Sequence, residues 1–245
     1  MDVKREIEDR VAFIRKVLAD SHSKGIVFGN SGGKDSALVG ILCKMACPDT
    51  VAVIMPCFSQ RNYTVDKQDG MELSSKFNIE TRVVDLTPVR AQMLSQLEGV
   101  AKLNDAAIVN IAPRLRMTTL YAIAAAEGRL VAGTGNRSER FVGYFTKWGD
   151  GACDFNPIAD LTVGEIYELL EYLGCPRSII DKAPSASLYD GQTDEKELGI
   201  TYKDLDRYIA FERTQGKREP RLEKMFNASA HKRKPPVLYR SLDEE

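Results

Sequence analysis

Apolar residues recur at every third or fourth position in the first segment of the chain, residues 3–20. The stripe consists of Val3, Ile7, Val11, Ile14 and Leu18. One apolar face of this kind is typical of an amphipathic helix that packs on a core. Helical patterns also cover residues 64–77, 162–173 and 202–212, and Gly174 is a typical end signal for the second of them.

Short apolar runs alternate with helical segments in the first half of the chain. Residues 25–29, 50–55, 79–84 and 129–132 predict short strands, with residues 50–55 as a buried one, and further helices are predicted at residues 34–46 and 85–103. Strands that alternate with helices usually form a parallel sheet that is covered on both faces. We therefore predict an α/β fold with a doubly wound, mostly parallel sheet.

The run from residue 114 to residue 126 is rich in helix-forming residues and unusually apolar. A helix with so little polar surface must be largely buried. The sequence leaves two partners open for this helix, which are the core of the chain and a second subunit.

The chain has 245 residues, which suits one sizeable core, so we predict a single domain over residues 1–245. Lysine and arginine number 34 against 35 aspartates and glutamates, a balance that disfavours binding to nucleic acid or an anionic membrane. A small anionic ligand that is bound locally fits better. No apolar run reaches the roughly 20 residues that span a bilayer, and the start lacks an apolar secretion signal, so we expect a cytoplasmic protein.

Five cysteines are scattered along the chain without any C-x-x-C pair. They are Cys43, Cys47, Cys57, Cys153 and Cys175. An odd number without paired spacing favours buried, reduced thiols over a zinc site or a redox motif.

A glycine pair stands between the predicted strand at residues 25–29 and the predicted helix at residues 34–46, in the string Ser31-Gly32-Gly33-Lys34-Asp35-Ser36. Such a loop brings backbone N–H groups close to an anion at the positive end of a helix dipole. The two serine hydroxyls add hydrogen-bond donors, and Asp35 suits a magnesium ion held between phosphates. The loop therefore predicts a phosphate site. A glycine turn without a ligand is the alternative, in which this combination of residues would be a coincidence.

The loop does not fit the Walker A pattern of common kinases and ATPases. That pattern requires glycine where Phe28 stands and serine or threonine where Asp35 stands. A nucleotide that is cleaved between its β and γ phosphates is thus disfavoured.

A second polar stretch, residues 133–151, follows the predicted strand at residues 129–132. It fails as a dinucleotide fingerprint because Ser138 stands where glycine is required. As an active-site wall it offers Glu139 as a second magnesium ligand, and Lys147, Asp150 and Asp154 for a charged substrate. A calcium loop at Asp150 and Asp154 is disfavoured, because the D-x-D-x-D-G spacing is absent.

The string Ser-Gly-Gly-x-Asp-Ser resembles the signature of the PP-loop, or N-type ATP pyrophosphatase, superfamily, whose fold is of the adenine nucleotide alpha hydrolase type. Three further blocks look like the NAD synthetase family. They are Gly133-Thr134 with Glu139, the run Phe145-Thr-Lys-Trp-Gly-Asp-Gly151, and the later segments 198–202 and 231–233. This resemblance covers nearly the whole chain.

The resemblance implies a set of site residues. ATP would contact Gly29, Asn30, Ser31, Gly32, Gly33, Lys34, Asp35, Ser36 and Thr134, and magnesium would bind Asp35 and Glu139. Nicotinic acid adenine dinucleotide, or deamido-NAD, would contact Arg114, Lys147, Asp154, His231 and Lys232. Taken without the resemblance, Arg114 would be read as a surface arginine at a helix end and His231 as an exposed histidine of the tail.

Two positions near ATP depart from the family pattern. Val163 stands where the family commonly has lysine, and Ser185 stands where it commonly has threonine. Serine keeps the hydroxyl, whereas valine removes a charge.

The reaction implied by the family is amidation of deamido-NAD to NAD⁺ by ammonia through an acyl-adenylate, with release of AMP and pyrophosphate. Lys147 and Asp150 are the predicted catalytic residues, with Asp150 holding ammonium and accepting its proton. The family also implies a homodimer, and a chain of this length leaves no room for an attached glutaminase domain. Other PP-loop ligases, such as GMP synthetase or a tRNA thiolase, and a regulatory protein that only binds nucleotide are the competing interpretations.

Overall fold

A four-stranded parallel sheet forms the centre of the computed structural model, which describes residues 1–183 and 193–239; Ser185 lies outside the described residues. The strands are β1 (Gly25–Gly29), β2 (Thr50–Ile54), β3 (Glu80–Val83) and β4 (Arg129–Ala132), in the order β3-β2-β1-β4. All three strand pairings are parallel. The predicted α/β fold with a parallel sheet is therefore confirmed.

One face of the sheet packs against α1 (Val3–Ser21), α2 (Lys34–Ala46), α4 (Val65–Lys76) and α9 (Val163–Tyr172). Ile26 and Phe28 of β1 point to this face and are fully buried. Gly40 lets α2 lie close to the sheet, because a Cβ at this position would be 2.5 Å from the Phe28 ring. The apolar stripe predicted at the start of the chain supplies Ile7, Val11 and Ile14 to the same core.

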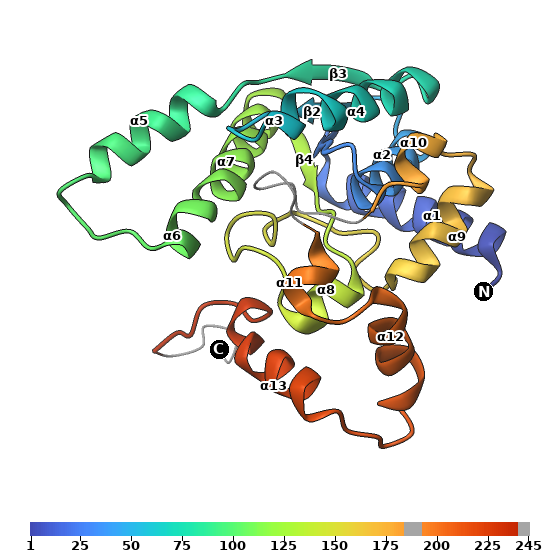
Figure 1. Cartoon of the computed structure of the whole chain (residues 1–245). Helices are drawn as coiled ribbons and strands as arrows, with labels where there is room; N and C mark the ends of the chain where they lie inside the picture. Colours follow the sequence, from blue (N-terminus) through green and yellow to red (C-terminus); the bar gives the residue numbers. More distant parts are fainter. Residues whose placement is uncertain (184–192, 240–245) are drawn as a thin grey trace.

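The other face of the sheet packs against α7 (Ile111–Glu127). Val27 of β1 and Val131 of β4 contact the cluster that contains Met117 and Leu120 of this helix. Adjacent residues of a strand point to opposite faces, which is why the strands β1 and β2 read as continuous apolar runs. The edge strand β3 is exposed or half-buried at every position. Helices thus cover both faces, and the doubly wound arrangement is confirmed (Figure 1).

Only one side of α7 is buried in this chain. Its exposed side carries Arg114, Thr118, Ala122, Ala125 and Ala126. The core of the chain therefore accounts for the buried side alone, and burial of the other side against a second subunit stays a prediction.

The prediction of one long helix over residues 85–103 is wrong in its extent. It is divided into α5 (Thr87–Leu97) and α6 (Asp105–Val109). Gly99 has a φ of +79° between them, a left-handed conformation that ends a helix. Neither α5 nor α6 contains a buried residue, and α5 extends away from the sheet (Figure 1).

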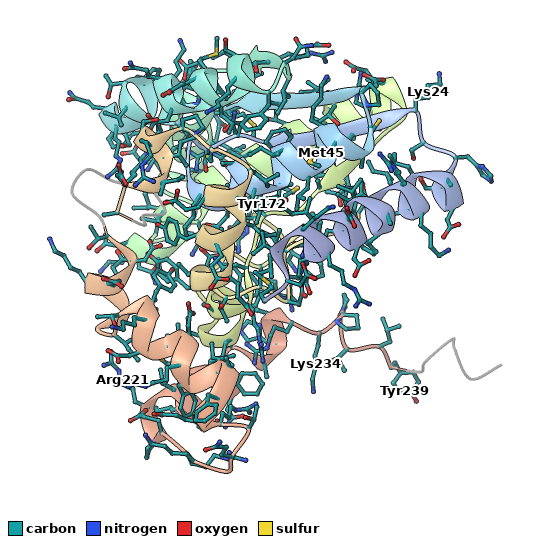
Figure 2. All side chains as sticks on the ribbon, turned by 90° about the vertical axis from the view of Figure 1, so that its right-hand side faces the viewer. Lys24, Met45, Tyr172, Arg221, Lys234 and Tyr239 are labelled. Atoms are coloured by element: carbon teal, nitrogen blue, oxygen red, sulfur yellow. The ribbon has the colours of Figure 1, made fainter. Side chains whose placement is uncertain are left out.

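The remaining helices are short. They are α3 (Gln60–Tyr63), α8 (Arg137–Val142), α10 (Arg177–Ile180), α11 (Asp194–Leu198), α12 (Tyr202–Arg207), a π turn (Tyr208–Glu212), α13 (Pro220–Ala228) and a 3₁₀ turn (Ala230–Lys232). Helices α8, α12 and α13 enclose a third apolar cluster around Phe141, Leu205 and Tyr208. In Figure 2 Arg221 of α13 and Lys24, next to β1, lie at opposite ends of the molecule, and residues 234–239 run along its outside.

All five cysteines are free, four of them buried and Cys153 half-buried, as predicted for reduced thiols. Burial raises the pKa of the Cys43 thiol. Within the described ranges, no helix is both long and apolar enough to pass through a bilayer.

Candidate active site

A cavity of about 610 Å³ opens at the carboxyl end of the sheet, where β1 and β4 lie side by side. The chain continues from β1 to β2 on one side, while β4 lies on the other side, so the strand order reverses here. Ligands of open α/β sheets bind at such a position. The wall consists of the glycine loop, the loop after β4, one side of α7 and the segment around Thr146.

Gly32 allows the loop after β1 to turn close to α4. Its φ is +69°, and a Cβ built on it would lie 2.2 Å from the Asp66 carbonyl oxygen. A side chain is therefore excluded both by conformation and by space. Gly33 follows as the N-cap of α2, so the positive end of this helix dipole faces the cavity.

Polar side chains fix the shape of the loop. Ser36 Oγ donates to the Gly33 carbonyl oxygen at 3.0 Å. The buried Asn30 side chain accepts from Gly32 N at 3.2 Å and donates to the Gly70 carbonyl oxygen at 2.9 Å. The loop is thus preorganised for an anion, so its backbone would rearrange little when an anion binds.

The predicted ATP residues lie together around this loop. The cavity is lined by Gly29, Asn30, Ser31, Gly33, Lys34, Asp35, Ser36 and Thr134, and Gly32 lies within the turn.

Asp35, from the first turn of α2, and Glu139, from α8, are two of the carboxylates that line the cavity. Asn136 lies between them with a fully buried side chain. Its Nδ2 donates to Asp35 Oδ1 at 2.9 Å, and its Oδ1 accepts from Glu139 N at 2.9 Å, so the capping box of α8 also holds Asp35. Burial and the Asp35 charge raise the pKa of the Glu139 carboxyl well above its ordinary value.

These two carboxylates suit a divalent cation. Mg²⁺ commonly takes one or two carboxylates and completes its octahedral shell with water and phosphate oxygens. Across residues 1–183 and 193–239, no cluster of three or more histidine, cysteine, aspartate or glutamate side chains would hold a metal ion by itself. A cation at Asp35 and Glu139 would therefore need ligands that the nucleotide brings.

Lys34 places a positive charge beside the same carboxylates. Its side chain is buried, and Nζ donates to Asp35 Oδ2 at 2.7 Å. Burial by itself lowers the pKa of the Lys34 ammonium, but the charges of Asp35 and Glu139 outweigh it and raise that pKa above its ordinary range. Lys34 is therefore the counterion of Asp35.

A second lysine, Lys182, joins α4 and the segment after α10 to the glycine loop. Its Nζ donates to Asp66 Oδ1 at 2.6 Å, to Asp69 Oδ2 at 2.8 Å and to the Gly32 carbonyl oxygen at 3.2 Å. Asp66 and Asp69 are buried in α4. One ammonium thus satisfies two buried carboxylates and holds the glycine turn against α4.

Asp150 and Lys232 line the cavity on the side away from the glycine loop. Asp150 Oδ1 accepts from Thr146 N at 3.0 Å, and desolvation by the surrounding wall raises the pKa of its carboxyl although its surface is open to the cavity. Lys232 Nζ donates to the carbonyl oxygens of Gly143 and Phe145, both at 2.8 Å. This side of the cavity therefore carries a carboxyl group, on Asp150, and an ammonium group, on Lys232, in fixed positions.

Four of the residues predicted to bind the substrate or act in catalysis lie outside the cavity wall of this chain. They are Arg114, Lys147, Asp154 and His231. Arg114 donates to the Lys147 carbonyl oxygen at 3.4 Å, and Lys147 Nζ lies 5.2 Å from the centre of the Trp148 ring. Asp154 accepts from Val131 N at 2.7 Å and from Tyr121 at 3.1 Å. Arg114 thus lies on the exposed side of α7, and Asp154 lies on the surface beside this helix.

Val163 is also outside the cavity wall. It is buried at the start of α9 and belongs to the third apolar cluster with Leu205 and Tyr208. Its side chain is therefore not part of the cavity in which ATP is expected, and its predicted contact with ATP stays a prediction.

Comparison with known proteins bears on the identity of this site. The sequence model of the NAD synthase family matches residues 6–236 of the chain. The chain belongs to the NAD synthase family. Within this family it is 42% identical over 234 residues to a protein named NH(3)-dependent NAD(+) synthetase from Carboxydothermus hydrogenoformans, with 94% of this chain and 95% of that protein covered.

Solved structures related to the NAD synthase family share the fold. The structure of NMN synthetase from Francisella tularensis has a TM-score of 0.89 and 36% identity, over 97% of this chain and 98% of that one. The NH3-dependent NAD synthetase from Campylobacter jejuni, in complex with the nitrate ion, has a TM-score of 0.80 and 31% identity, over 98% of this chain and all of that one (100%). The likeness therefore extends over almost the entire chain.

Sequence reasoning missed Asn136, Lys182 and Arg116 of this NAD synthase family site. Asn136 had a local signal, because Asn-x-x-Glu is a capping-box spacing. Lys182 had none, since its partners Asp66 and Asp69 are more than a hundred residues away along the chain. Arg116 was read as part of an apolar helix, whereas it lines the cavity and donates to the Met55 carbonyl oxygen at 3.1 Å.

Proposed function

We propose that this chain catalyses the ATP-dependent amidation of deamido-NAD by ammonia to NAD⁺, with release of AMP and pyrophosphate. The observation that carries the proposal is the preorganised glycine loop with Asp35 and Glu139 on one cavity, in a chain of the NAD synthase family. Family membership favours this reaction over those of the other PP-loop ligases.

The first step activates the nicotinate carboxylate. An ionised carboxylate does not react with ammonia, so one of its oxygens attacks the α phosphorus of ATP and expels pyrophosphate, which gives an acyl-adenylate. The glycine loop and the N-terminus of α2 bind the β and γ phosphates and stabilise the charge that develops on pyrophosphate. Mg²⁺ at Asp35 and Glu139 would neutralise phosphate charge when it is bound.

The second step forms the amide. Ammonia attacks the acyl carbon, AMP leaves, and the nitrogen loses a proton. Asp150 lines the cavity with a carboxyl whose pKa is raised by desolvation, which brings it closer to that of an effective proton acceptor. We assign Asp150 to holding ammonium and accepting this proton. Lys147, the other predicted catalytic residue, would act from the surface next to α7.

A homodimer is part of the proposal. Two residues assigned to deamido-NAD are exposed here, Arg114 on α7 and Asp154 beside it, and the exposed side of α7 is rich in alanine. Val89 and Met93 are exposed on α5, a helix without any buried residue. A second copy that covers these helices would bury their apolar surface and place the substrate residues at the subunit boundary.

We assign the enzyme to the cytoplasm.

Amidation of nicotinic acid mononucleotide to NMN is a second candidate function. The TM-score of 0.89 with a structure titled NMN synthetase favours it. The two substrates carry the same nicotinate carboxylate, so the chemistry at the glycine loop would be unchanged. They differ in the adenylate half, which only the dinucleotide presents to the protein.

The test is a parallel assay of the purified enzyme with ATP, Mg²⁺ and ammonium, and with either deamido-NAD or nicotinic acid mononucleotide. We expect AMP, pyrophosphate and NAD⁺ in equal amounts, and a higher kcat/KM for the dinucleotide. A higher kcat/KM for the mononucleotide would establish the second candidate. ATP bound without turnover of either substrate would indicate a regulatory protein.

A further inference from the structure

Lys34 contacts one of the two carboxylates that are assigned to the proposed magnesium ion. Its Nζ lies 2.7 Å from Asp35 Oδ2, and the residue is only 6% exposed. A cation therefore already occupies one oxygen of this carboxylate.

The bond to Lys34 is the one that a metal can replace. Asp35 Oδ1 accepts from Asn136, whose side chain is fully buried and fixed in the capping box of α8. Asp35 Oδ2 accepts from Lys34, which reaches it through a flexible four-carbon chain. Because a lysine can rotate away without disturbing the backbone, Oδ2 is the oxygen that becomes available to an entering cation.

We propose that the Lys34 ammonium is a built-in cation of the nucleotide-free enzyme, which excludes free Mg²⁺ from Asp35 and Glu139 until Mg²⁺ enters together with ATP. The proposal rests on the proposed function for the identity of the nucleotide. Its chemical basis is charge balance in a confined site. A divalent ion added beside the ammonium would meet repulsion, and removal of the ammonium without a new partner would leave a buried charge unpaired.

ATP resolves this conflict because it brings its own negative charge. Lys34 lines the cavity together with Ser31, Gly33 and Ser36 of the glycine loop. Phosphate oxygens bound at this loop would give the displaced ammonium a new partner within reach of its side chain, and would complete the coordination of Mg²⁺. Metal and nucleotide would thus bind cooperatively. The Lys34 ammonium would then contact phosphate oxygens of the nucleotide.

The test measures metal binding without any substrate. Mn²⁺ stands in for Mg²⁺, and its free concentration is read from the electron paramagnetic resonance signal during titration of the full-length enzyme. We expect the wild type to bind Mn²⁺ weakly. Lys34→Met should bind Mn²⁺ roughly tenfold more tightly or better, because one nearby charge changes the affinity of a charged site for a cation by about a factor of ten or more. Lys34→Arg keeps the cation and should remain weak. The gain should disappear in Lys34→Met/Glu139→Gln.

Lys232→Met is the matched control. Lys232 also places an ammonium at the cavity, but its hydrogen bonds go to the carbonyl oxygens of Gly143 and Phe145, not to Asp35 or Glu139. Equal Mn²⁺ binding by Lys34→Met and Lys232→Met would overturn the proposal, as would tight binding to the nucleotide-free wild type. Thermal melting confirms that each variant is folded. Since no acid substrate is present, these results stand or fall independently of the amidation assay.

Discussion

The side-chain amide of Asn136 donates to Asp35 Oδ1 at 2.9 Å and so joins the start of α8 to the first turn of α2. These two residues are about a hundred positions apart along the chain, yet they place both acids of the site on the same cavity. The capping box of α8 therefore serves the site as well as the helix.

Asn136→Ala should reduce both stability and turnover. Loss of an N-cap costs about 1 kcal/mol, and loss of a hydrogen bond to a charged group costs about 1.5–3 kcal/mol. Denaturant unfolding and the Mg²⁺ dependence of turnover measure the two effects. Thr162→Ala removes the same kind of capping box from α9, and Thr162 does not line the cavity. The control should lose the cap energy alone, and an equal loss of turnover there would refute a special role for Asn136.

Lys182→Met should be strongly destabilising, because it leaves the buried Asp69 without this cation and Asp66 with Arg61 at 3.3 Å as its remaining ion-pair partner. Removing one partner of a buried ion pair costs about 3–5 kcal/mol. The free energy of unfolding checks this. Lys16→Met breaks the exposed pair with Asp20 at 2.6 Å and should cost less than about 1 kcal/mol. Similar losses in the two variants would show that the Lys182 cluster is not tightly coupled.

Asp150→Asn should stabilise the fold while it impairs amidation. Desolvation raises the pKa of this carboxyl in the folded protein above 3.8, its ordinary value. The folded state then holds its proton more tightly than the unfolded state, so wild-type stability falls as pH rises through the interval between the two pKa values. The stability gain of the variant should be absent below the lower pKa and complete above the higher one. Thermal melts over a pH series measure it.

The same variant tests the catalytic assignment. At limiting ammonium, Asp150→Asn should lose turnover, while its KM for ATP stays at the wild-type value. Wild-type turnover at low ammonium would remove Asp150 from the mechanism.

Val163→Ala should affect stability only. Val163 is buried in the third apolar cluster and does not line the cavity. The loss of two methyl groups should cost about 1–3 kcal/mol in the free energy of unfolding. The KM for ATP should be unchanged, and a severalfold increase would restore Val163 to the ATP site.

Ala122→Arg should separate the proposed dimer. Ala122 is exposed on α7, and a long charged side chain there would obstruct close packing of a second copy. Sedimentation should show monomers with a wild-type melting profile at low concentration, together with a reduced affinity for deamido-NAD. Ala12→Arg on the exposed side of α1 is the control and should leave assembly intact. A wild type that is monomeric at assay concentration would contradict the dimer directly.

The sequence determined the elements of the sheet and the nature of the site. Runs such as residues 25–29 are apolar at every position because both faces of the strand are buried, and this local pattern needs no tertiary information. The glycine loop is equally local. The turn at Gly32 and the start of α2 lie within a few residues of one another, so their spacing alone indicates phosphate chemistry.

Only the tertiary structure decided which charges meet. Lys182 reaches Asp66 and Asp69 because α4 and the segment after α10 pack on the same loop, and Asn136 reaches Asp35 because β4 lies beside β1. Such contacts depend on strand order and helix packing, which no periodicity in a sequence specifies. Val163 shows the same limit, because only packing places its side chain in an apolar cluster, while its contact with ATP, which the family resemblance implies, stays a prediction.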